Sequence, residues 1–193
     1  NLLKYLKKLV IISLITILAI LWKNIESFIY KNLYHNNQSD NIIEFDLNGE
    51  IREYLLHIPK NIQPNAPLVF VLHGLRSTNS FIKENSFMDS VANKNGFVVC
   101  YPQGSSSTKN TIYTKQGSYF WNVGYEIHKN ETVDDIFFLK SLAIFLQKEY
   151  NLDPEKTFCT GMSNGGDMSY LLGCEAPDVF KAIAPITGCM MGW

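Results

Sequence analysis

One serine in this sequence has the neighbours that a catalytic nucleophile requires. The string Gly161-Met162-Ser163-Asn164-Gly165 has the form G-x-S-x-G and falls between a predicted strand (157–160) and a predicted helix (165–174). A sharp turn between the two elements would expose the serine hydroxyl above the N-terminus of the helix, where developing negative charge is stabilised. Glycines suit such a turn because they carry no Cβ that could clash. The context favours Ser163 as a nucleophile over a Gly/Ser turn without chemistry.

A second motif predicts the groups that would stabilise the charge formed by attack of Ser163. His73-Gly74 directly follows the apolar run Leu68–Leu72. A loop in this place donates one backbone N–H to an oxyanion, and the residue after the nucleophile donates another. We therefore predict that the N–H groups of Leu75 and Asn164 form an oxyanion hole. His73 itself is predicted to be structural rather than the general base, because it lies in the oxyanion segment.

The elements that would position these residues alternate between strand and helix after an opening hairpin. Asn48-Gly49 is a strong hairpin turn, and the later apolar runs are typical of strands buried on both faces. A mostly parallel sheet with helices on both faces is therefore expected. The predicted strands are 42–47, 51–58, 68–72, 97–101, 157–160 and 182–186. The predicted helices are 87–94, a helix that starts at Thr132, and 165–174. Thr132 and Asp135 are predicted to form a capping box at the start of the second of these helices. A long polar loop is predicted over 105–125.

The first part of the chain is predicted to direct export. Lys4, Lys7 and Lys8 precede an apolar run from Leu9 to Trp22. This pattern is typical of a signal peptide or an uncleaved signal anchor within residues 1–23, and the two are equally consistent with it. We thus expect a polar linker over 24–41 and a catalytic domain over 42–193. The protein would be secreted and extracellular, or tethered to the membrane through residues 4–23.

Composition excludes several other functions. The formal net charge is −1, so no basic field favours nucleic acid as a partner. The four histidines have no metal-ligand spacing and the four cysteines form no CxxC pair, so no metal and no cofactor is expected. The cysteines fit either disulfides or buried free thiols. The sequence does not indicate an oligomeric state.

The chain resembles the secreted poly(3-hydroxybutyrate) depolymerase and feruloyl esterase group of the α/β-hydrolase fold. The resemblance runs from about Arg52 to Gly188. It rests on these segments together: Arg52-Glu53-Tyr54, Pro67 to Gly74, Val99 to Gly104, Trp121-Asn122, Val133-Asp134-Asp135, Gly161 to Gly166 and Ala182 to Pro185. It implies hydrolysis of carboxylic esters through an acyl-enzyme without a cofactor. The implied substrates are polymeric or aryl esters, such as polyhydroxyalkanoates and feruloylated or acetylated plant polysaccharides.

Two further sites have competing interpretations. Trp121 would line the substrate cleft or belong to the core, and the sequence favours neither. Asp134 and Asp135 could be catalytic acids. We favour a structural role for both in the first turn of a helix, because acids there complement the helix dipole. A catalytic role is less consistent with their position, because the triad acid follows the serine in this fold.

The residues after Ser163 include Asp167, Glu175 and Asp178 but no histidine. A serine hydroxyl is a poor nucleophile without an adjacent base. We expect the triad acid and histidine to lie beyond Trp193 in a longer protein, and the chain as printed to be inactive. Two alternatives stay open: a serine peptidase of the same fold, and a non-catalytic binding module that lacks the triad histidine.

Overall fold

The computed structural model describes residues 16, 21–22, 42–108, 110 and 115–190. The chain divides into two compact units, Asn1–Asp40 and Asn41–Trp193, and the second contains every strand described below. The predicted export segment, residues 4–23, and the predicted linker lie almost entirely outside the described residues. None of the helices in the described part of the chain has the length and apolar character needed to cross a membrane.

A six-stranded sheet forms the centre of the second unit. The strand order is β1-β2-β4-β3-β7-β8. β1 pairs with β2 and β2 with β4 in antiparallel fashion, whereas β4, β3, β7 and β8 are parallel. The strands are β1 (Ile43–Leu47), β2 (Glu50–His57), β3 (Leu68–Leu72), β4 (Val98–Pro102), β7 (Thr157–Met162) and β8 (Ala182–Ile186). The fold is thus the predicted mostly parallel sheet with an opening antiparallel hairpin.

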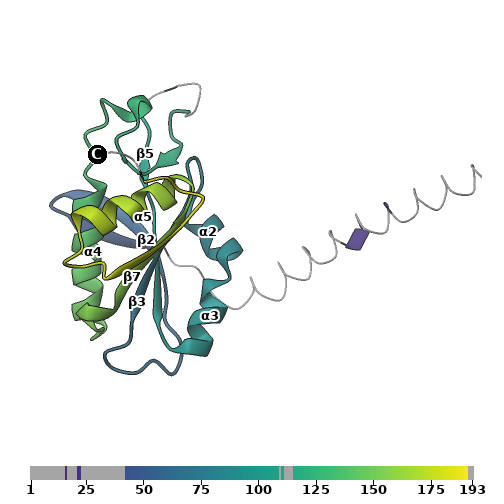
Figure 1. Ribbon diagram of the computed structural model, residues 1–193, viewed down its shortest axis with the longest axis vertical. Helices are drawn as coiled ribbons and strands as arrows, with labels where there is room; N and C mark the ends of the chain where they lie inside the picture. Colours follow the sequence, from purple (N-terminus) through teal and green to yellow (C-terminus); the bar gives the residue numbers. More distant parts are fainter. Residues whose placement is uncertain (1–15, 17–20, 23–41, 109, 111–114, 191–193) are drawn as a thin grey trace, which may run out of the picture. The chain divides into compact units, whose positions relative to one another are not determined.

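Helices cover both faces of this sheet (Figure 1). The helix α4 (Asp135–Glu149) and the helix α5 (Asn164–Glu175) lie on one side, and α2 (Asn79–Ser86) and α3 (Met88–Asn95) on the other. Each face has its own apolar cluster, to which β3 contributes Phe70 on one side and Val71 on the other. Successive residues of a strand point to opposite faces, so the continuous apolar run of β3 is explained by burial on both.

The structure corrects the predicted elements at three places. α4 begins at Asp135, and its N-cap is Asp134, whose carboxylate accepts a hydrogen bond from the N–H of Phe137 at 2.9 Å. The predicted capping box starting at Thr132 is therefore wrong. The predicted loop 105–125 contains a short antiparallel pair, β5 (Ser105–Ser106) with β6 (Tyr119–Phe120). Helix α2 was not predicted, because its sequence has few apolar residues to mark a buried face.

All four cysteines are free thiols. Cys100 and Cys159 are buried in the core between the sheet and the helices α4 and α5. Burial raises the pKa of Cys159 to about 12, which makes this thiol unreactive at neutral pH. These two side chains act as small core hydrophobes.

A buried ion pair joins the sheet to α4. Arg52 of β2 and Asp135 of α4 approach to 2.7 Å, and their side chains are 5% and 0% exposed. The second Asp135 oxygen accepts the N–H of Asn122 at 2.8 Å, and the Arg52 guanidinium lies 3.9 Å from the centre of the Phe138 ring. Burial raises the pKa of Asp135, while the Arg52 charge acts in the opposite direction. Asp135 thus has a structural role that its position in the first helical turn did not indicate.

Two neighbouring aspartates should therefore differ sharply in their effect on stability. Asp135→Ala leaves the Arg52 charge buried and uncompensated, and should lower the free energy of unfolding by about 3 to 5 kcal/mol. Asp134→Ala removes only an exposed helix cap and should cost about 1 kcal/mol. Urea unfolding followed by circular dichroism measures both. Equal losses for the two variants would contradict the assignment of the buried pair.

Candidate active site

The backbone at Ser163 is held in a conformation that few residues adopt. Ser163 lies between β7 and α5 with φ of 54° and ψ of −119°. Such a conformation costs of order 1 to 3 kcal/mol in a residue with a Cβ and persists only where the surroundings impose it. The N–H of Ser163 is held by the carbonyl of Ile186 at 2.9 Å and by the Thr187 hydroxyl at 3.3 Å. The Ser163 side chain remains exposed, as a nucleophile must be.

The two flanking glycines make this turn sterically feasible. A Cβ added at Gly161 would lie 2.3 Å from the carbonyl oxygen of Gly165. A Cβ added at Gly165 would lie 2.5 Å from the carbonyl oxygens of both Leu72 and His73. No side chain fits at these distances, so α5 can start this close to β3 only with glycine at both positions. The sequence prediction of a sharp strand-to-helix turn corresponds to this geometry.

The loop after β3 lies beside Ser163. A Cβ added at Gly74 would be 3.6 Å from the Cβ of Ser163 and 3.3 Å from the carbonyl oxygen of Met162. Gly74 begins a turn closed by the N–H of Ser77 at 3.1 Å, which leaves the N–H of Leu75 outside that hydrogen bond. Asn164 is the first residue of α5, and the first N–H groups of a helix have no partner within it. The two predicted oxyanion donors therefore belong to segments that meet at Ser163.

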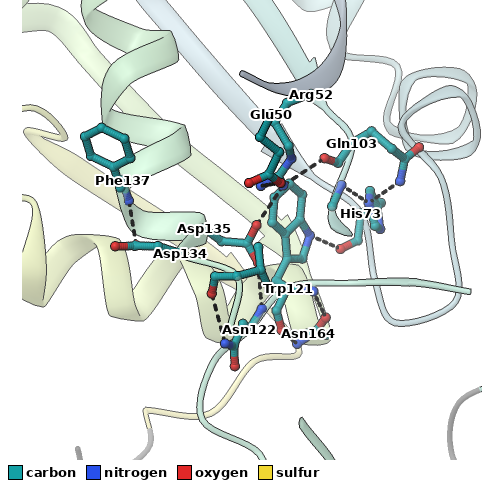
Figure 2. Close-up of polar contacts among 12 residues, drawn as sticks. Glu50, Arg52, His73, Gln103, Trp121, Asn122, Asp134, Asp135, Phe137 and Asn164 are labelled. Atoms are coloured by element: carbon teal, nitrogen blue, oxygen red, sulfur yellow. Dashed lines mark hydrogen bonds and ion pairs between the residues drawn. The ribbon is translucent and has the colours of Figure 1, made fainter. Parts of the chain in front are cut away.

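His73 is fully buried and holds two loops together. Its Nε2 accepts a hydrogen bond from the N–H of Gly104 at 2.9 Å. The amide nitrogen of the Gln103 side chain lies 2.8 Å from the same Nε2 and also donates to it (Figure 2). The ring is therefore the neutral tautomer with its proton on Nδ1, and this proton is donated to the Gly74 carbonyl at 2.8 Å. Burial lowers the pKa of His73 from 6.5 to about 4. Both nitrogens point to structural partners, so this histidine is not placed to take a proton from Ser163.

Trp121 lies beneath the site, with no exposed surface. Its indole N–H donates to the His73 carbonyl at 2.9 Å. The Asn164 side chain accepts the Trp121 backbone N–H at 2.8 Å and donates to the Trp121 carbonyl at 3.0 Å, as Figure 2 shows. This placement favours the core interpretation of Trp121 over a contact with substrate. The Asn164 side chain thereby also has a structural role, because it fixes the 119–122 segment against the start of α5.

Asp167 was expected only as a residue of the α5 helix, but the structure shows it bridging two other segments. One oxygen accepts the backbone N–H of Cys189 at 2.6 Å, and the other accepts the hydroxyl of Tyr125. Burial, aided by this hydrogen bond, raises the pKa of Tyr125 to about 12. Through Cys189, Asp167 holds the segment that follows β8. Ile186 at the end of β8 and Thr187 after it bind the N–H of Ser163.

The structure thus brings Ser163, Asn164 and the His73–Leu75 loop together at the carboxyl ends of β3 and β7. Within the described part of the chain, no histidine forms a hydrogen bond with Ser163. In that same part, no three His, Cys, Asp or Glu side chains lie close enough to hold a metal ion. The sequence analysis did not assign a role to Gln103, which orients His73. The side-chain oxygen of Gln103 accepts the Asn79 N–H at 3.0 Å, and its side-chain nitrogen therefore faces His73.

Comparison with known proteins agrees with this arrangement. The family model described as "Putative esterase" matches residues 47–192, and the chain belongs to this family. Poly(3-hydroxyalkanoate) depolymerase C of Paucimonas lemoignei is 29% identical over 150 residues, which cover 76% of this chain and 34% of that protein. Feruloyl esterase D of Neurospora crassa is 28% identical over 149 residues, with 76% and 48% covered. A bifunctional acetylxylan esterase/xylanase of Neocallimastix patriciarum is 26% identical over 140 residues, with 72% and 18% covered. The chain thus spans less than half the length of each of these relatives.

Solved structures share the fold. An acetyl xylan esterase from Aspergillus awamori matches with a TM-score of 0.58 at 20% identity, covering 74% of this chain and 50% of that chain. An S-formylglutathione hydrolase from Agrobacterium tumefaciens matches with a TM-score of 0.59 at 17% identity, covering 76% and 57%. At these identities the likeness establishes the α/β-hydrolase architecture that the sequence predicted.

The buried, neutral state of His73 predicts a specific pH dependence of stability. Between pH 6.5 and about 4, the unfolded chain binds a proton at this histidine that the native protein excludes. The free energy of unfolding should therefore fall as the pH falls through this window, by up to about 3 kcal/mol from this group. His73→Gln, which keeps an acceptor but does not titrate, should show a shallower fall. Urea unfolding at several pH values measures the difference in slope.

An NMR measurement tests the same point without a variant. The Cε1–H resonance of His73 should stay constant from neutral pH down to about pH 5, because its pKa lies below this range. A titration of that resonance with a midpoint near 6.5 would show that the ring is accessible to protons and would contradict the buried tautomer.

Proposed function

We propose that this chain supplies the nucleophile and the oxyanion hole of a serine ester hydrolase. The observation that carries the proposal is the strained, exposed Ser163 at the start of α5, beside the loop that follows β3. Backbone strain of this kind costs free energy that the surrounding structure must offset, and it is concentrated at functional sites. The family of the chain and the activities for which its relatives are named favour a carboxylic ester over a peptide as the substrate.

The proposed mechanism has two stages. The Ser163 hydroxyl attacks the ester carbonyl carbon, and its proton passes to a histidine base as the C–O bond forms. The N–H groups of Leu75 and Asn164 donate to the oxygen that becomes negative, and α5 adds the favourable field of its N-terminus. The alcohol leaves with the proton, and water then hydrolyses the acyl-serine through the same base. No histidine follows Ser163 in the 193 residues, and the proposal assigns the base and its acid partner to a longer protein of which these residues are a part.

The proposed substrates are polymeric or aryl esters. The relatives are named as esterases of acetylxylan and feruloyl groups and as a depolymerase of poly(3-hydroxyalkanoate). The exposed position of Ser163 is compatible with an ester that belongs to a large molecule. We also predict export directed by residues 4–23, either as a cleaved signal or as an anchor that stays in the membrane. Export would place the enzyme where such polymers occur.

The test uses the protein expressed from the complete coding region. It should hydrolyse p-nitrophenyl acetate and react with a fluorophosphonate probe, and Ser163→Ala should abolish labelling and lower kcat by at least about a thousandfold. Ser90→Ala is the matched control, because Ser90 is also an exposed serine but lies on α3. Turnover that survives Ser163→Ala would overturn the assignment of the nucleophile. Full folding without labelling or turnover would favour the binding-module alternative.

A further inference from the structure

A second strained residue lies directly beside Ser163. Thr187, the first residue after β8, has a left-handed backbone conformation with φ of 51°. A side chain that branches at Cβ is an outlier in this region, whereas glycine adopts it without strain. Strained residues are concentrated at functional sites. The nucleophile and the oxyanion donors account for the positive φ of Ser163 but give Thr187 no role.

Contacts on both sides fix the position of Thr187. The preceding residue, Ile186, is paired with the end of β7 in the sheet. The following residue, Gly188, packs so closely on the start of α5 that an added Cβ would lie 2.5 Å from a backbone carbon. Cys189 then donates its N–H to the carboxylate of Asp167 at 2.6 Å. The backbone of Thr187 is therefore held in place before any substrate binds.

The hydroxyl of Thr187 has a proton available for a bound molecule. Its oxygen accepts the N–H of Ser163 at 3.3 Å, so its own O–H remains a donor. Among the described residues no acceptor for this proton lies within range, and Thr187 is exposed. The contact with Ser163 does not by itself explain a threonine here, because the Ile186 carbonyl already accepts the same N–H at 2.9 Å. The exposed O–H is thus a positioned donor beside the nucleophile.

The order of the strands places this donor across Ser163 from the loop that carries Leu75. β7 leads into the serine and lies between β3 and β8. The Leu75 loop follows β3, and Thr187 follows β8. When the carbonyl oxygen of an ester binds the N–H groups of Leu75 and Asn164, the other substituents of that carbon must point away from this loop. The alkoxy oxygen can then approach the Thr187 hydroxyl.

We propose that Thr187 is a further catalytic residue, whose hydroxyl donates a hydrogen bond to the alkoxy oxygen of the ester as the alcohol leaves. The inference rests on the proposed function and assigns a donor to its second half-step. As the tetrahedral intermediate collapses, the bond from the former carbonyl carbon to the alkoxy oxygen breaks, and its electron pair moves to that oxygen. Thr187 stabilises the growing charge and keeps its own proton. The proposed histidine base delivers to the alcohol the proton that it took from Ser163.

Such a donor accelerates the reaction only where charge on the alkoxy oxygen limits the rate. An alkyl alcohol is a poor leaving group and needs this stabilisation, whereas an activated phenol leaves without it. The dependence of the rate on the leaving group therefore distinguishes a hydrogen bond to this oxygen from a purely structural role of Thr187.

The experiment compares two acetate esters with the protein expressed from the complete coding region. Ethyl acetate has a poor leaving group and p-nitrophenyl acetate a good one, and both form the same acyl-enzyme. Thr187→Val keeps the shape of the side chain without its hydroxyl. It should lower kcat/KM for ethyl acetate by about tenfold or more, and for p-nitrophenyl acetate by less than about threefold. Thr187→Ser, which keeps the hydroxyl, should restore most of the lost activity.

Thr160→Val is the matched control, because it makes the same substitution within the same pair of strands. The Thr160 hydroxyl on β7 donates to the carbonyl of Ala184 at 2.6 Å and is therefore already engaged. This variant should leave the ratio of the two kcat/KM values unchanged. Thr187→Gly tests folding separately, since glycine removes the hydroxyl and the backbone strain together. It should lose activity as Thr187→Val does, with a urea midpoint no lower than that of the wild type.

Two outcomes would overturn the role of Thr187: an equal loss on both esters in Thr187→Val, which would indicate a general disturbance of Ser163, or full activity of that variant on ethyl acetate. Normal fluorophosphonate labelling alongside either outcome would leave the proposed function intact. Failure of the proposed function would appear elsewhere, as absent labelling of the unsubstituted protein or as turnover that survives Ser163→Ala, and would overturn both.

Discussion

The close contact between the start of α5 and the end of β3 is the constraint on which the rest of this site depends. It requires the absence of a Cβ at Gly161 and Gly165, where any side chain would overlap carbonyl oxygens of the neighbouring backbone. The contact forces Ser163 into its unusual backbone conformation and exposes its hydroxyl. It also brings the loop after β3 beside the serine, so that one turn positions both the proposed nucleophile and the proposed oxyanion donors.

A buried polar network keeps this arrangement rigid. His73 binds Gly104 and Gly74 with its two ring nitrogens, and its carbonyl accepts the indole N–H of Trp121. Asn164 then ties Trp121 to the first turn of α5. Four chain segments are thereby joined without a disulfide among the four cysteines. Because each of these groups is buried, loss of one partner leaves another unsatisfied, and the loops have few alternative arrangements.

The protonation state of His73 matters for the surface around Ser163. Ser163 is exposed next to the segments that carry the proposed oxyanion donors, the N–H groups of Leu75 and Asn164. A protonated His73 imidazole would lose its acceptor for the Gly104 N–H, and the loop that continues into Gly74 would lose that anchor.

The sequence by itself determined strands of the parallel part of the sheet and the serine turn, because these are recorded in local patterns. The continuous apolar runs predicted β3 and β8 with their observed bounds, and the paired glycines predicted the sharp turn at Ser163. Only the tertiary structure decided what Asp135, His73 and Trp121 do. Asp135 meets Arg52 across 83 positions of sequence, and Trp121 meets Asn164 across 43. Burial and partner choice depend on such distant neighbours, which no local pattern of residues encodes.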